Sequence, residues 1–94
     1  MEKKTALEKI DFVLMKRGAE IHIKNVLESV KKYVEAESGF DYDLTMQYIQ
    51  SQMSGKMGGV YMYANKALEF LKNELKAERK KEKVNNKQTD NENT

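Results

Sequence analysis

Apolar residues recur along this chain at intervals of three and four, the spacing that places side chains on one face of an α-helix. The pattern is clearest between about residues 20 and 37, where aliphatic positions lie opposite lysines and a glutamate. The aliphatic stripe consists of Ile23, Val26, Leu27, Val30 and Val34. Its β-branched residues would also suit a strand, but the helical period favours an amphipathic helix that ends at Ser38-Gly39.

The same spacing predicts a helix on either side of the chain's middle. The first runs from about Glu2 to Lys16, and Gly18 is placed to end it. Its inward positions are Leu7, Ile10, Val13 and Leu14. The last runs from Val60 to about Lys80. Its inward positions are Val60, Ala64, Ala67, Leu68, Leu71 and Leu75.

A shorter helix is predicted to begin at Leu44, with Asp43 as its N-cap. Its apolar side is expected to carry Leu44, Tyr48, Ile49 and Met53. Three of the five glycines fall within Ser54–Gly59, so this helix must stop before the last one begins.

These four segments contain no proline, and together they predict an all-α fold, a compact bundle of about four helices. We expect one domain over residues 1–81. The polar end of the chain, residues 82–94, has a single aliphatic residue and is expected to be a disordered tail.

Composition narrows the possible roles. The chain has 94 residues and no cysteine, so disulfides cannot supplement a small core, and a homodimer is one way to enlarge it. No apolar run is long enough for a membrane span. The amino-terminal segment contains acidic residues and lacks the apolar stretch of a signal peptide, so a cytoplasmic location is expected. Seventeen basic residues against 15 acidic ones give a net charge of only +2, without a clear excess of the kind typical of nucleic-acid binders.

Candidate chemistry is sparse. His22 is the only histidine, and it has neither a cysteine nor a suitably spaced carboxylate for a metal site or a catalytic triad. We therefore expect a protein that is not an enzyme, with no catalytic residues, metal, cofactor or small-molecule substrate. Gly58-Gly59 could present backbone amides to a phosphate, but the pair lacks the spacing and strand of a phosphate-binding loop.

Tyrosine and methionine are concentrated in the middle of the chain, and both are common at protein interfaces. Among these residues, the first candidates for an exposed, partner-binding surface are Tyr42, Met57, Tyr61 and Met62. The first hypothesis is a small non-enzymatic regulatory or adaptor protein that acts through protein–protein contact, including contact with a second copy of itself. Compact, lysine-rich chains of this kind are also common among proteins of mobile genetic elements.

The alternative is a DNA-binding transcriptional regulator. Residues 44–75 resemble a helix-turn-helix, in which the second helix enters the major groove. The residues expected to bind nucleic acid are Lys56, Tyr61, Asn65 and Lys66, with Asn65 reading adenine and the lysines contacting phosphates. Two positions depart from the motif: Gln50 stands where a small residue is expected, and Ser54 where glycine is expected. An ordinary helical hairpin with a glycine-rich loop would give the same outline.

Overall fold

Four α-helices make up the computed structural model, which describes the backbone of residues 1–56 and 58–92 and the side chains of residues 1–56 and 58–82. The helices are α1 (Lys3–Arg17), α2 (Ile21–Ala36), α3 (Tyr42–Gln52) and α4 (Gly59–Glu92). No strand occurs in the described residues. The predicted all-α bundle is therefore confirmed.

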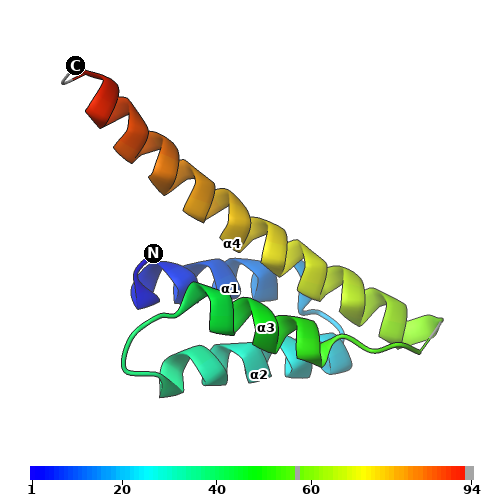
Figure 1. Cartoon of the computed structure of the whole chain (residues 1–94). Helices are drawn as coiled ribbons and strands as arrows, with labels where there is room; N and C mark the ends of the chain where they lie inside the picture. Colours follow the sequence, from blue (N-terminus) through cyan, green and yellow to red (C-terminus); the bar gives the residue numbers. More distant parts are fainter. Residues whose placement is uncertain (57, 93–94) are drawn as a thin grey trace.

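The first three helices run antiparallel in chain order, so the α1–α2 and α3–α4 connections meet at one end of the molecule (Figure 1). The α2–α3 connection lies at the opposite end. Helix α4 crosses this layer and packs against all three other helices (Figure 1). At the end of the molecule that holds the α1–α2 and α3–α4 connections, α1 and α3 end and α2 and α4 begin. Residues from all four helices therefore meet there.

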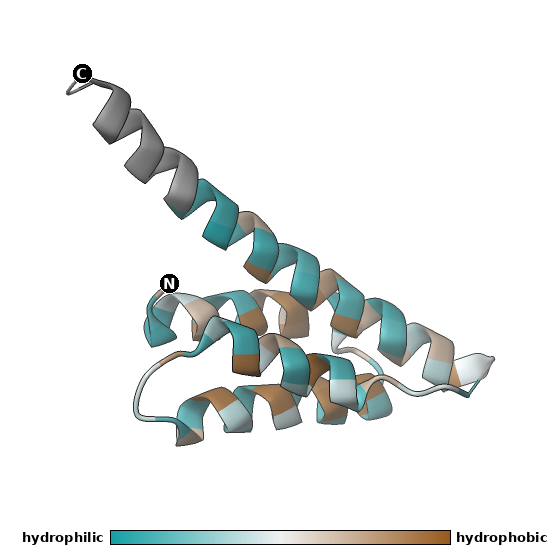
Figure 2. Ribbon diagram, viewed as in Figure 1, coloured by the Kyte–Doolittle hydropathy of each residue, from teal (hydrophilic) through white to brown (hydrophobic). Residues whose placement is uncertain are grey.

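The core forms where the apolar faces of the four helices meet, and these faces turn inward in the ribbon (Figure 2). The aliphatic stripe of α2 is buried except for Val26, which is half-buried. In α4 the predicted Ala67, Leu68, Leu71 and Leu75 are buried, and in α1 Ile10 and Val13 are joined by Ala6. The helical period therefore identified most of the core correctly.

The inward face of α3 differs from the prediction at one position. Leu44 is 49 % exposed, whereas the neighbouring Thr45 is buried with Ile49, one turn further along. Tyr48 lies on the flank of α3, where its ring stacks on Tyr33 of α2 with 4.3 Å between ring centroids. Leu44 lies one turn before Tyr48 on the same flank, near the start of the helix, and there it remains in solvent.

Side chains and glycine define several of the helix ends. Asp41, not the predicted Asp43, caps α3: its carboxylate accepts a hydrogen bond from the Leu44 amide at 2.9 Å. Both aspartates are good capping residues, but the first lies far enough forward for Tyr42 to begin the helix. Gly18 ends α1 as predicted, and its amide donates to the Leu14 carbonyl at 2.8 Å.

Helix α4 begins at Gly59, one residue before its predicted start, and is assigned to Glu92 rather than ending near Lys80. The predicted disordered tail comprises residues 82–94. The side chains of residues 83–94 lie outside the described part of the chain. None of the described helical residues forms a stretch long and apolar enough to cross a bilayer.

Candidate functional site

The end of the molecule at the α3–α4 turn exposes three consecutive large side chains. Tyr61, Met62 and Tyr63, in the first turns of α4, are 42 %, 45 % and 59 % exposed. Successive helical residues point about 100° apart, so the three side chains spread around the helix rather than along one face. The start of α4 therefore presents apolar surface in several directions.

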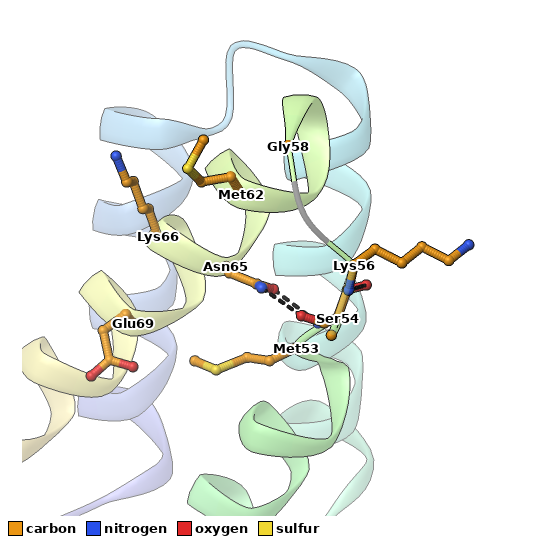
Figure 3. Close-up of a pocket in the computed structure, with 9 residues that line it drawn as sticks. Met53, Ser54, Lys56, Gly58, Met62, Asn65, Lys66 and Glu69 are labelled. Carbon is orange, nitrogen blue, oxygen red and sulfur yellow. Dashed lines mark hydrogen bonds between the residues drawn. The ribbon is translucent and has the colours of Figure 1, made fainter.

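A pair of hydrogen bonds fixes the start of α4 against the end of α3. The Ser54 amide donates to Oδ1 of Asn65 at 2.9 Å, and Nδ2 of Asn65 donates to the Ser54 carbonyl at 2.7 Å (Figure 3). Gly58 and Gly59 lead into the helix with φ angles of 87° and 54°, in the region that glycine adopts at no steric cost. We call this arrangement the Ser54–Asn65 clasp.

Beside the clasp is an open hollow of about 590 Å³ between the end of α3 and the start of α4. Met53, the residue after α3, and Met62 of α4 both line it, and Lys66 and Glu69 lie along the α4 side (Figure 3). Its other lining residues are Ser54, Gly55, Lys56, Gly58 and Asn65. We call it the Met53–Met62 hollow. Flexible methionine side chains can adapt to an apolar group of varied shape.

Two smaller hollows flank the same turns of α4. One, of about 400 Å³, lies between Tyr63 and Lys66 of α4 and the α1–α2 connection. The other, of about 320 Å³, lies beside Tyr61 and His22. The first turns of α4 are thus bordered by hollows on several sides, the arrangement expected of a surface that lacks a covering element.

Four exposed cations surround these hollows, each held over an aromatic ring. Lys56 lies 5.1 Å from the ring centroid of Tyr61, and Lys66 lies 5.9 Å from that of Tyr63. On the α1 side, Lys16 lies over Phe12 at 5.7 Å, and Arg17 over Phe70 at 4.9 Å. We call Lys16, Arg17, Lys56 and Lys66 the basic end.

The carboxylates close to the basic end already have partners. Glu20 caps α2 by accepting from the amides of His22 and Ile23 at 2.8 and 3.0 Å, and its other oxygen lies 2.6 Å from Nδ1 of His22. The hydrogen bond from the His22 ring, with those two amides, lowers the pKa of the Glu20 carboxyl below its ordinary value of 4.5. Glu69 forms an ion pair with Lys72 at 3.7 Å. Among the described residues, no carboxylate forms an ion pair with the four cations.

The four residues predicted to bind a protein partner do not all lie together. Tyr61 and Met62 are neighbours in the exposed start of α4. Tyr42 lies at the opposite end of the bundle, half-buried, with the Arg79 guanidinium 4.2 Å from its ring centroid. Met57 lies outside the described residues.

The nucleic-acid set is brought together at one end, but its members are not equally free. Lys56, Tyr61 and Lys66 are exposed. Asn65 is half-buried, and both heteroatoms of its amide already bond to Ser54, the same two atoms that a bidentate contact with adenine would need. Asn65 is placed to hold the turn rather than to read a base.

Three contributors to this surface are absent from the predicted sets, namely Met53, Tyr63 and the Lys16–Arg17 pair. The pair could have been placed from the sequence, because a short α1–α2 connection puts the end of α1 beside the start of α2. No pattern in the sequence would have indicated the Ser54–Asn65 clasp, which joins a loop to a helix 11 residues later.

The described residues contain no group of three or more histidine, aspartate or glutamate side chains that could hold a metal ion. Comparison of the chain with models of known protein families, with curated proteins and with solved structures found no match. The candidate site therefore has to be interpreted from its own geometry.

Proposed function

We propose that this protein is a small non-enzymatic regulatory or adaptor protein that binds another protein through the exposed start of α4. One observation carries the proposal: Tyr61, Met62 and Tyr63 are consecutive and exposed, Met62 lines the Met53–Met62 hollow, and the two tyrosines each line one of the smaller hollows beside it. Tyrosine and methionine are enriched at interfaces, and a hollow beside them can seat an apolar side chain of the partner.

Site-specific photo-crosslinking tests this proposal. A benzoylphenylalanine placed at Met62 should give protein adducts in extracts of the source cells. The matched control is the same group at Leu44, which is equally exposed but lies at the other end of the bundle. We expect adducts from position 62 that are missing from position 44. Identical adducts from both positions would contradict a partner site at the start of α4.

Affinity for the identified partner gives the quantitative check. Tyr61→Ala and Met62→Ala should each weaken binding by more than about 1 kcal/mol, because truncating a central apolar anchor removes contacts that the rest of the interface cannot replace. Leu44→Ala should leave the affinity unchanged. Equal affinities for all three variants would place the interface elsewhere.

The second candidate function is DNA binding through the same end, and the observation that favours it is the basic end itself. Lys56 and Lys66 would contact phosphates, whereas the engaged Asn65 weakens the argument for base reading. Fluorescence anisotropy with mixed-sequence duplex DNA, from low to physiological salt, tests it. Binding that weakens with salt, with a slope reduced by about 1 for each of Lys56→Glu and Lys66→Glu, would favour DNA. Absence of binding at low salt would eliminate it.

A further inference from the structure

We infer that the partner of the α4 start is an acidic segment that carries an apolar anchor, which sits in the Met53–Met62 hollow while carboxylates of the segment contact the basic end. This inference rests on the proposed function and specifies the chemistry of the partner.

The charges favour an anionic partner. Three segments bring these cations to one end of the bundle: α1 supplies Lys16 and Arg17, the α3–α4 turn supplies Lys56, and α4 supplies Lys66. The nearby acids, Glu20 and Glu69, are committed to a helix cap and to Lys72. The described part of this end therefore presents a net positive surface whose cations have no carboxylate partner of their own.

The aromatic rings prepare these cations for a partner. A lysine held over a tyrosine face keeps its ammonium group in solvent while its mobility is reduced, so less side-chain entropy is lost when a carboxylate binds. Lys56 lies on Tyr61 and Lys66 on Tyr63. Because Tyr61 and Tyr63 point about 200° apart around the helix, the two ammonium groups flank the start of α4 on opposite sides.

The hollow between the two lysines favours a partner with an apolar anchor. Met62 lies between Tyr61 and Tyr63 in the sequence and lines the same hollow as Met53, the residue that follows α3 (Figure 3). In Figure 3 the Lys56 side chain extends away from the hollow, whereas Lys66 rises along its α4 side. A segment that crosses the start of α4 can therefore place an apolar side chain on the methionines and acidic side chains toward either lysine.

A second copy of the chain fits this surface less well. Self-association through the same end would be isologous and would bring Lys16, Arg17, Lys56 and Lys66 close to the same four residues of the other copy. Like charges at a forming interface oppose association. A different, acidic chain satisfies the same cations without that repulsion.

The test is a selection of random dodecapeptides displayed on phage, carried out in parallel on the full chain, on its Lys56→Glu/Lys66→Glu variant and on Leu44→Ala. The full chain and Leu44→Ala should enrich peptides with several acidic residues around one or two large apolar residues. The double charge reversal should not enrich them. The best peptide, synthesised and measured by anisotropy, should bind roughly fivefold or more weakly to the double reversal and to Met62→Ala. Circular dichroism of each variant establishes that it is folded.

Several results would overturn the inference. These are no enrichment on the full chain, enriched peptides without an excess of acidic residues, and affinities unaffected by the charge reversal. Equal binding of poly-glutamate or of a thymidine dodecanucleotide would also overturn it, because the surface would then attract any polyanion without using the hollow. Position 62 could also crosslink to a protein whose affinity is unchanged by the Lys56→Glu/Lys66→Glu substitutions. That result would support the proposed function and contradict the acidic partner.

Discussion

At the scale of single residues, Asn65 has the most specific role that the structure assigns. Its amide bonds both the donor and the acceptor of Ser54, in the part of the chain that joins α3 to α4. Its helical position and side-chain type, which are all that the sequence shows, predict a place on a DNA-reading face. The hydrogen-bond partner depends on how the glycine-rich turn folds back, which the period of apolar residues does not encode.

Asn65→Ala is expected to lower the free energy of unfolding by about 1–3 kcal/mol, because two half-buried backbone groups of Ser54 lose their partner. Urea unfolding followed by circular dichroism measures this change. Asn73→Ala is the matched control, because Asn73 is exposed in the same helix and the change should be neutral or slightly stabilising. Equal stability of the Asn65→Ala and Asn73→Ala variants would contradict the clasp.

The Glu20–His22 contact predicts a response to acid. Because the folded-state pKa of Glu20 is lowered, its charged form stabilises the folded state above the ordinary pKa of 4.5, and this contribution is lost as the pH falls through the folded-state pKa. The hydrogen bond from the His22 ring is the largest cause. His22→Ala should therefore raise the Glu20 pKa toward 4.5, which an NMR titration of the carboxyl carbon can follow. An unchanged midpoint would show that the backbone amides alone lower it.

At the scale of elements, the helices themselves follow from the sequence, and the errors occur where two neighbouring faces compete. In α2 the apolar stripe was continuous, and it is the face that packs. In α3, residues 44/48 and 45/49 form two adjacent rows, and only contacts with α2 and α4 decide which row is buried. The buried row contains Thr45, a polar residue, so the sequence pattern did not indicate that this row faces the core.

Alanine substitutions in α3 should reveal this choice of face. Ile49→Ala is expected to cost about 2–5 kcal/mol, because Ile49 is fully buried and its loss leaves a cavity. Leu44→Ala, on the exposed flank of the same helix, should change stability by no more than about 0.5 kcal/mol. Chemical denaturation measures both, and the milder Ile49→Val, at about 0.5–1.5 kcal/mol, serves if the alanine variant does not fold. A larger cost at Leu44 than at Ile49 would reverse the assignment.

The α3–α4 turn depends on the backbone conformation of two glycines. Gly58→Ala and Gly59→Ala should each destabilise the fold by about 1–2 kcal/mol, because both positions have positive φ. Gly55→Ala is the control within the same turn. A side chain there would contact nothing within 4 Å, and its φ lies outside the positive range, so the change should stabilise by about 0.4–1 kcal/mol. Thermal unfolding of the three variants compares them, and a destabilising Gly55→Ala would indicate an unrecognised contact.

At the scale of the whole molecule, charge is distributed unevenly between the two ends of the bundle. The basic end is at the α1–α2 and α3–α4 connections, whereas residues 35–43, at the α2–α3 connection, contain four carboxylates, and the basic side chains in contact with this segment, Lys3 and Arg79, come from α1 and α4. The net charge of +2 concealed this polarity, because an average over the chain cannot show which segments the fold brings together. Antiparallel packing of short-looped helices is what separates the two groups.

This polarity predicts the behaviour of the isolated protein in solution. Pairing of the basic ends of two copies should be weakest at low ionic strength, where their like charges repel most, and sedimentation at several salt concentrations measures it. Any association through that end should increase as salt screens the repulsion, over a Debye length of about 10 Å at 0.1 M. The Lys56→Glu/Lys66→Glu variant should lose this salt dependence. A dimer that is tightest at low salt would place the self-interaction on another face.

The Ser54–Asn65 clasp and the two positive-φ glycines have a consequence for how this protein could change over time. They hold the start of α4 in place through contacts that do not involve the exposed side chains of Tyr61, Met62 and Tyr63. The residues proposed to bind a partner are therefore different from those that hold the turn in its conformation. Positions 56, 61, 62, 63 and 66 could be varied together on an unchanged framework, so the same small bundle could acquire a new target without first losing its shape.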